Sequence, residues 1–369
     1  MVKPLRIAIL APLKRAITPD VTASRPRVIV DLVSELVARG HKVTIFGTGD
    51  STLPGVEIVP IVPKALNTLP ASENPFYQHT AFLVMQIKIL VDRQADFDIV
   101  HNHMYPEFLA LLSGASLQTP LVTTVHAQMT AEMAAVLRQF SSSTLIAISE
   151  SAAKLSGLPL SVIHNGIDTE LFTVNPEVSR EYLLFVGRMS KAKDAAGKFL
   201  DPKGVQTAIT LAEESGERLK IVGNVEDPAF FDELIKPHLS DTIEFVGEVH
   251  SEQTLKRQEM VALFQGAKAF INPINWEEPF GLVMAEAAAC GTPVIAYKRG
   301  SVAELVVDGK TGFIVDPGEG VAGLKKSLGR VGEITSQSCR EHAIQRFSKA
   351  RMADDYEKLY SRVVLSSSG

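Results

Sequence analysis

Short apolar segments alternate with amphipathic ones from the start of the chain. Leu5–Ala11 is a compact apolar run, Arg27–Ala38 repeats apolar side chains at helical spacing, and His41–Gly47 is apolar again. Continuous short apolar runs are typical of strands that are buried on both faces of a parallel sheet. The pattern therefore predicts a strand, helix, strand unit and an α/β protein.

The same alternation continues through the chain and divides it into two similar halves. A polar segment, Asp168–Glu181, separates them and is the best candidate for a linker. Further strands are expected at Gly55–Val62, Phe97–His103, Leu121–His126, Leu145–Ile148, Leu160–Ile163, Tyr182–Val186, Leu219–Val225, Ile243–Val249 and Ala267–Ile274, and further helices at residues 76–93, 254–264, 321–328 and 339–364. No repeat of fixed period is present, so the halves share an architecture only.

Length and composition agree with two globular α/β domains. The 369 residues exceed one ordinary core, and 46% hydrophobic with 21% charged residues and a net charge of −5 favour a globular enzyme over a nucleic-acid binder or a disordered chain. We predict domains at residues 1–170 and 171–345, followed by a terminal helix and tail at residues 346–369. The two cysteines, Cys290 and Cys339, have no metal-ligand spacing and suggest a reducing compartment.

No segment has the pattern of a membrane span or a secretion signal. Lys3 and Arg6 precede an apolar run, but that run is short, contains Pro12 and has no small-residue cleavage pattern after it. We expect a cytoplasmic protein, with peripheral contact at the inner membrane face left open.

The stretch from Asn272 to Asp316 carries the clearest chemistry. An apolar strand leads to Gly281, where an alanine-rich helix starts, and the free backbone amides of a helix start favour an anion. Glu278 lies before this start and Glu286 inside the helix. Two carboxylates would repel a phosphate, so accepting hydrogen bonds from sugar hydroxyls is their natural role. A nucleotide sugar has a diol on each side of a phosphate.

Two cations lie on either side of an earlier strand-to-helix connection. Arg188 follows the strand at Tyr182–Val186, and Lys203 comes just before the next helix. Such a pair can hold phosphate oxygens, although two solvated surface cations would give the same pattern. The lysine-rich stretch Ser190–Leu200 between them is interpreted as a surface insertion.

Glu278 and Glu286, with Phe280-Gly281-Leu282 between them and Gly291-Thr292-Pro293-Val294 after, resemble the E-x7-E signature of retaining glycosyltransferases of family 4. This resemblance extends over nearly the whole chain. It implies the GT-B fold, in which two Rossmann-like domains face each other across a cleft and the C-terminal helix crosses back to the first domain. The first domain would hold the acceptor, and the second the donor.

The same resemblance implies roles for individual residues of the second half. Arg188 and Lys203 would neutralise the donor diphosphate, Glu278 would orient the donor sugar, and Glu286 would bind the ribose. The remaining donor-binding positions would be Phe280, Gly281, Leu282 and Val283 at the helix start and Gly223, Gly247 and Val249 near the nucleobase.

In the first half, His126 is the main candidate. It falls at the carboxyl end of a predicted strand, where open α/β sheets bind ligands, and in similar enzymes this histidine lies by the donor sugar and the reaction centre. His101 and His103 share one face of another strand, but no further ligands lie nearby, so a metal site is not predicted. The family's glycine pair before the first helix is replaced by Ala23-Ser24, which puts the phosphate approach there in question; amides or Arg25 are the alternatives.

Two other segments receive structural interpretations. Residues 76–93 are interpreted as a helix with one core-facing and one polar side. Ser301 and Glu304 match a capping box at the start of a short helix. Asn165-Gly166 resembles the family's interdomain turn.

The resulting prediction is transfer of a hexosyl unit from a nucleoside diphosphate sugar to an acceptor hydroxyl with retention, without a metal or other cofactor. Family frequency favours a UDP-sugar, with GDP-mannose as the alternative. The acceptor is expected to be a small molecule, a glycan or a lipid-linked molecule, and the enzyme a monomer or homodimer that binds no nucleic acid. A related sugar-nucleotide epimerase and a catalytically impaired nucleotide-sugar-binding protein are the rival interpretations. A glycoside hydrolase would also have paired carboxylates but no use for the cations.

Overall fold

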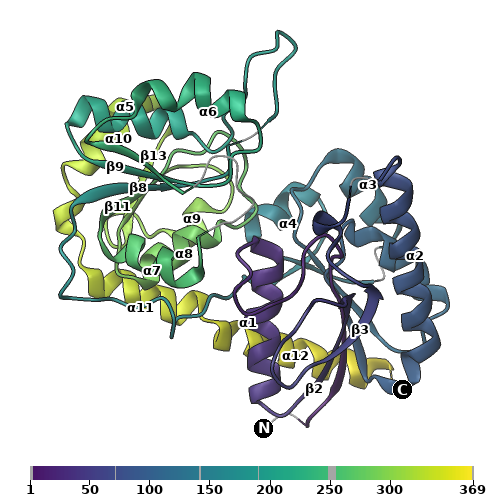
Figure 1. The fold of residues 1–369 in the computed structure, drawn as a ribbon. Helices are drawn as coiled ribbons and strands as arrows, with labels where there is room; N and C mark the ends of the chain where they lie inside the picture. The colour runs from purple at the N-terminus through teal and green to yellow at the C-terminus, as the bar shows by residue number, and fades with distance from the viewer. Residues whose placement is uncertain (1–2, 71, 141–142, 190, 248–254, 368–369) are drawn as a thin grey trace. The chain divides into compact units, whose positions relative to one another are not determined.

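The chain folds into two compact units, each built on its own sheet. The computed structural model describes residues 3–70, 72–140, 143–189, 191–247 and 255–367. Unit 1 comprises Met1–Gly166 together with Lys349–Gly369, and unit 2 comprises Ile167–Ser348 (Figure 1). The first change of unit therefore falls directly after Asn165-Gly166, the pair that resembles an interdomain turn in the sequence.

Unit 1 is a doubly wound parallel sheet with the strand order β3-β2-β1-β4-β5-β6-β7. Every pairing in this sheet is parallel, so each connection has to cross over, and helices supply most of the crossovers. The strands are β1 Arg6–Leu10, β2 Lys42–Thr48, β3 Glu57–Val62, β4 Ile99–Asn102, β5 Leu121–Val125, β6 Thr144–Ala147 and β7 Ser161–Val162, and the α-helices are α1 Ser24–Ala38, α2 Pro75–Arg93, α3 Ala131–Gln139, α4 Glu150–Ser156 and α12 Lys349–Ser367.

Unit 2 repeats the plan with the order β10-β9-β8-β11-β12-β13, again all parallel. Its strands are β8 Tyr182–Val186, β9 Leu219–Val222, β10 Ile243–Val246, β11 Ala267–Asn272, β12 Val294–Tyr297 and β13 Gly312–Val315. Its α-helices are α5 Val205–Ser215, α6 Pro228–Leu234, α7 Arg257–Gln265, α8 Leu282–Ala289, α9 Val302–Leu305, α10 Gly320–Leu328 and α11 Ser336–Phe347.

Apolar strand residues form the core on both faces of each sheet. In unit 1, Leu10 and Val100 pack with Leu83 and Leu90 of α2. In unit 2, the central strands contribute side chains to a larger cluster that also includes Phe230 of α6. Burial on both faces is the reason why the strand segments are apolar throughout rather than alternating.

The C-terminal helical region is two helices and not the single segment, residues 339–364, predicted from the sequence. Ser348 has an extended backbone (φ −66°, ψ 148°) that ends α11 and precedes α12. Helix α12 then packs on α1 of unit 1 (Figure 1). Arg39, directly after α1, forms ion pairs of 2.6 Å with both Asp354 and Glu357. The predicted return of the terminal helix to the first domain is confirmed.

Helix α2 has the predicted core-facing and polar sides, and it also exposes large apolar side chains. Leu83 faces the core, and Lys88 is exposed on the other side. Phe76, Tyr77 and Val84 are 80%, 72% and 57% exposed, respectively. No helix within the described ranges combines the length and apolar character that crossing a bilayer requires.

Candidate active site

The topology of each sheet identifies where a ligand would bind. In unit 2 the connection from β8 runs to β9 on one side, and the connection from β11 runs to β12 on the other. The loops after β8 and β11 therefore diverge, and doubly wound sheets bind ligands in the crevice outside the carboxyl ends of such strands. In unit 1 the equivalent place is outside β1 and β4.

In unit 2, these two loops bring Lys203 and Glu278 together. The Lys203 ammonium forms a short ion pair with Glu278 Oε2, which also accepts a hydrogen bond of 3.1 Å from Trp276 Nε1. The ammonium lies 4.8 Å from the centre of the Trp276 ring. Two residues that are far apart in sequence and were predicted to bind the donor are thus direct neighbours.

Backbone contacts hold the two loops in place. Asn275 donates from its backbone to Pro202 O (2.8 Å) and from its side chain to Asp201 O (2.9 Å). Asp201 in turn accepts backbone hydrogen bonds at the start of α5, from Gly204 (2.8 Å) and Gln206 (2.9 Å) among others. Burial raises the pKa of the Asp201 carboxyl, and these hydrogen bonds act in the opposite direction. Lys203 is therefore presented from a fixed turn.

Glu278 is also fixed from a second side. Ser301 donates its backbone N–H to Glu278 O (3.1 Å), and its hydroxyl donates to Phe280 O (2.5 Å). The predicted capping box at Ser301 and Glu304 is therefore wrong: α9 has no side-chain cap, because the serine hydroxyl is used to hold the neighbouring loop. Tertiary contact takes precedence over the local motif.

The start of α8 agrees with the expected geometry. Gly281 precedes the helix in a left-handed conformation (φ 84°), which favours glycine because other side chains rarely adopt it. Phe280 and Leu282 are buried, Val283 is partly buried, and Glu286 is 1% exposed. The side chains of Phe280 and Leu282 therefore pack in the protein interior, and backbone amides are what the turn presents.

Arg188 lies on the surface with a different partner. Its side chain is 55% exposed, and its guanidinium forms an ion pair of 3.0 Å with Glu226. The end of β8 lies next to that of β9, where a Cβ on Gly223 would come within 1.7 Å of Gly187 O. Gly247 follows β10, and Val249 lies outside the described residues. Of the predicted cations, Lys203 contacts Glu278, whereas Arg188 contacts Glu226.

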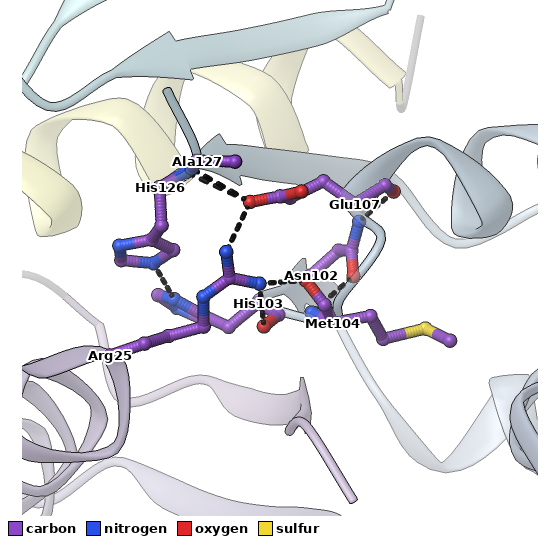
Figure 2. Close-up of polar contacts among 7 residues, drawn as sticks. All are labelled: Arg25, Asn102, His103, Met104, Glu107, His126 and Ala127. Atoms are coloured by element: carbon purple, nitrogen blue, oxygen red, sulfur yellow. Dashed lines mark hydrogen bonds and ion pairs between the residues drawn. The ribbon is translucent and has the colours of Figure 1, made fainter. Parts of the chain in front are cut away.

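In unit 1, a buried ion pair organises the loops at the corresponding place (Figure 2). Glu107 is fully buried, and its Oε1 accepts from Arg25 Nη2 at 2.6 Å and from the backbone amides of His126 and Ala127 at 3.1 Å each. Arg25, near the start of α1, also donates to the carbonyl of Met104. Glu107 and Arg25 thus fix the backbone at His126.

A line of three imidazoles continues from His126 into the interior. His103 Nδ1 lies 2.8 Å from His126 Nε2, and His103 Nε2 lies 3.2 Å from His101 Nδ1. His101 and His103 therefore do share a face, as predicted, but their nitrogens pair with one another instead of converging on one point. Among the described residues no group of three or more His, Cys, Asp or Glu side chains is placed to hold a metal ion.

Burial keeps these three histidines neutral. It lowers the pKa of His101 well below its ordinary value, and it lowers that of His103 to about 3. The pKa of His126 is lowered well below its ordinary value too, first by burial and then by the charge of Arg25. A neutral imidazole has one donor and one acceptor nitrogen, so each ring has a defined direction for its hydrogen bonds.

Sequence reasoning missed the role of Glu107 and of Asn102. Asn102 Nδ2 donates to Glu107 O (2.8 Å), and Asn102 Oδ1 accepts from the backbone of Met104 (2.9 Å), which fixes the turn after β4. The only available signal was a polar cluster at the end of an apolar strand. Nothing in the sequence links Glu107 to Arg25, which lies 82 residues earlier.

Family models match both halves of the chain. The model described as Glycosyltransferase Family 4 matches residues 26–171, and the one described as Glycosyl transferases group 1 matches residues 180–332. The chain belongs to glycosyltransferase family 4. The family resemblance that the E-x7-E segment suggested is confirmed.

Similar proteins cover this family 4 glycosyltransferase almost from end to end. Glycogen synthase of Mycobacterium tuberculosis is 27% identical over 92% of this chain and 89% of its own length. Sucrose-phosphate synthase of Thermosynechococcus elongatus has a TM-score of 0.75 at 19% identity, covering 98% of this chain and 99% of its own. The Anabaena protein HepE, solved with UDP-glucose, has a TM-score of 0.70 at 16% identity over 97% and 100%. These structures confirm the predicted GT-B fold.

Proposed function

We propose that this glycosyltransferase moves a hexosyl unit from a nucleoside diphosphate sugar to an acceptor hydroxyl with retention at the anomeric carbon. Unit 2 binds the donor, with Lys203 and Arg188 on the diphosphate, Glu278 on the sugar and Glu286 on the ribose. Unit 1 binds the acceptor and contributes His126. The observation that carries this assignment is the juxtaposition of Lys203 and Glu278 at the carboxyl ends of β8 and β11.

The chemistry of that pair fits a donor better than it fits a hydrolase. A departing diphosphate develops negative charge, which a preorganised ammonium and the amide end of α8 stabilise. The Glu278 carboxylate is held by Trp276, on a loop whose backbone Ser301 fixes, and can accept hydrogen bonds from sugar hydroxyls. The proposed transfer needs no metal, because cationic side chains and amides supply the charge stabilisation.

We propose UDP as the nucleotide and a glucose-type hexose as the sugar, with GDP-mannose as the alternative. Support comes from the similar protein HepE, which was crystallised with UDP-glucose. Gly223 and Gly247 would contact the base through backbone groups, together with Val249. Such contacts follow the shape of the base and do not depend on a particular side chain.

The proposal is tested by titrating UDP, GDP and ADP into the protein by calorimetry and then by screening the matching donors. The sole tryptophan, Trp276, contacts Glu278, so its fluorescence reports binding at the same site. Donor-dependent product mass and the anomeric configuration by NMR identify the sugar and the stereochemistry. Donor consumption without any acceptor, giving an isomerised nucleotide sugar, would support the epimerase instead.

Among the acceptor classes, a lipid-linked acceptor at the inner membrane face of a cytoplasmic enzyme is favoured by α2. Phe76, Tyr77, Val84 and Met85 of this helix expose apolar side chains, as interfacial helices do. Sedimentation with anionic phospholipid vesicles tests this contact. A bound fraction that falls in a Phe76→Ser, Tyr77→Ser double variant supports it, and the absence of binding by the wild type removes it.

A further inference from the structure

The histidine line of unit 1 ends on two tyrosines of the C-terminal helix. His101 Nδ1 lies 2.6 Å from the Tyr360 hydroxyl, and His101 Nε2 lies 2.8 Å from Thr124 Oγ1. Thr124 Oγ1 in turn lies 2.7 Å from the Tyr356 hydroxyl. His101 and Tyr360 are fully buried. One connected set of hydrogen bonds therefore runs from α12 to His126.

The buried Tyr360 hydroxyl determines which atom donates and which accepts in each of these hydrogen bonds. Within the described part of the protein, its hydrogen-bond partner is His101 Nδ1. A buried hydroxyl that fails to donate carries the full desolvation penalty of an unmade hydrogen bond. Tyr360 therefore donates, His101 Nδ1 accepts, and the proton of His101 is on Nε2, where it faces Thr124.

The same reasoning passes outward from His101. The in-plane lone pair of His101 Nδ1 is taken by the Tyr360 hydroxyl, so His103 Nε2, 3.2 Å away, contacts this nitrogen out of the ring plane, and the two rings are partly stacked with centroids 3.9 Å apart. His103 Nε2 carries the proton, because an N–H against this electron-rich nitrogen is favoured over a second lone pair. His103 Nδ1 is then the acceptor, and the proton between the next two rings belongs to His126 Nε2. His126 is left with a bare Nδ1. If donor and acceptor were exchanged in every one of these hydrogen bonds, His101 Nδ1 would carry a proton and the Tyr360 hydroxyl would have no acceptor.

We propose that Tyr360, acting through His101 and His103, is a positioning residue that fixes His126 in its Nε2–H tautomer, so that Nδ1 accepts a hydrogen bond from a substrate hydroxyl. The hydroxyl contact rests on the proposed function, whereas the tautomer does not. A neutral acceptor nitrogen selects a donating group, such as a sugar hydroxyl, over a carbonyl or a phosphate oxygen. His126 Nδ1 thus accepts a hydrogen bond from a hydroxyl because the buried Tyr360 side chain fixes the tautomer of the His126 ring.

The test uses two matched variants one helical turn apart. Tyr360→Phe removes the hydroxyl that sets the direction, and Tyr356→Phe removes the neighbouring hydroxyl, whose partner Thr124 still accepts from His101. Protein labelled with ¹⁵N-histidine gives long-range proton–nitrogen spectra that distinguish protonated from bare ring nitrogens. The His126 signals are assigned by their loss in His126→Gln. Thermal unfolding checks that each variant is folded.

We expect a bare Nδ1 on His126 in the wild type and in Tyr356→Phe, and a mixture of tautomers in Tyr360→Phe. Transfer should fall about tenfold in kcat for Tyr360→Phe, the equivalent of one lost hydrogen bond, and about twofold or less for Tyr356→Phe. A protonated Nδ1 in the wild type, or an unchanged tautomer in Tyr360→Phe, overturns the inference whatever the activity. If the tautomers behave as expected but His126→Gln transfers sugar normally, the hydrogen bonds between Tyr360 and His126 are as described. The role of His126 in the proposed function is then wrong.

Discussion

The two units place opposite kinds of chemistry at the same point of the same topology. Outside β1 and β4 the structure has neutral imidazoles and an arginine whose charge is matched by a fully buried Glu107. Outside β8 and β11 it has cations paired with carboxylates that are partly exposed, Lys203 with Glu278 and Arg188 with Glu226. A buried pair strongly resists separation, whereas a pair as exposed as Arg188–Glu226 contributes little and exchanges partners readily. We infer that unit 1 is preorganised and that the Arg188–Glu226 pair of unit 2 rearranges when an anion binds.

The largest effect is expected at Glu278. Glu278→Ala should reduce transfer by about 10²- to 10³-fold, because a contact made to the reacting sugar is lost. Nucleoside diphosphate affinity should stay the same or increase, since Lys203 is released from its carboxylate partner. Calorimetry and initial rates on the same preparation measure both. Equal loss of binding and transfer would remove Glu278 from the sugar site.

Arg188 and Glu226 should have effects of opposite sign on diphosphate binding. Arg188→Ala should weaken nucleoside diphosphate binding by about 10- to 100-fold, the value of a charge-assisted hydrogen bond, with nucleoside binding unchanged. Glu226→Gln should strengthen it by a few fold, about the energy of an exposed ion pair. Competition titrations against Trp276 fluorescence measure both. If both variants shift in the same direction, the pair is structural and does not compete with the ligand.

The neutral cluster of unit 1 should make stability depend on pH. The pKa values of His101, His103 and His126 are lowered on folding, so below about pH 6.5 the unfolded chain binds protons that the folded chain does not. Above that pH the neutral histidines do not lower the free energy of unfolding. As the pH decreases below it, the free energy of unfolding falls by up to about 1.4 kcal/mol per pH unit for each histidine. Urea unfolding between pH 7.5 and 5.5 measures the slope.

A matched pair of variants isolates the cluster. His103→Gln should reduce the slope of unit 1 unfolding with pH, whatever its effect on absolute stability. His238→Gln changes an exposed histidine in unit 2 and serves as the control. An identical slope in His103→Gln and the wild type would show that the buried histidines do not govern acid sensitivity.

The smallest effect is expected where the family's glycine pair is missing. Ala23 has φ −63° and ψ 134°, an extended conformation open to any residue, and α1 begins normally at Ser24. Ala23→Gly with Ser24→Gly should therefore change donor affinity and kcat by about twofold or less. A gain of tenfold in either would show that these two side chains hinder phosphate.

The helices and strands were predictable from the sequence because burial determines which of their positions are apolar. A strand buried on both faces is apolar at every position, so β8 was located from end to end. Boundaries that depend on other parts of the chain were not predictable. Ser348, which separates α11 from α12, is neither glycine nor proline, and the hydroxyl of Ser301 bonds across the fold to Phe280.

The candidate site was predictable in the same uneven way. Glu278 and Gly281 belong to one continuous motif, in which local spacing determines the geometry. Arg25 and Glu107 meet only through the sheet, and the ends of the histidine line, His126 and Tyr360, come together only after α12 returns. Patterns within one element show its own role, and they say little about distant partners.

The return of α12 also has a consequence for synthesis of the chain. Tyr360 is synthesised after all of unit 2. His101, His103 and His126 therefore leave the ribosome before Tyr360 has been added to the chain. A fragment that stops at Gly166 therefore lacks α12 and with it part of unit 1. Unit 1 is the first unit to begin translation, but it can complete its fold only after unit 2 has been synthesised.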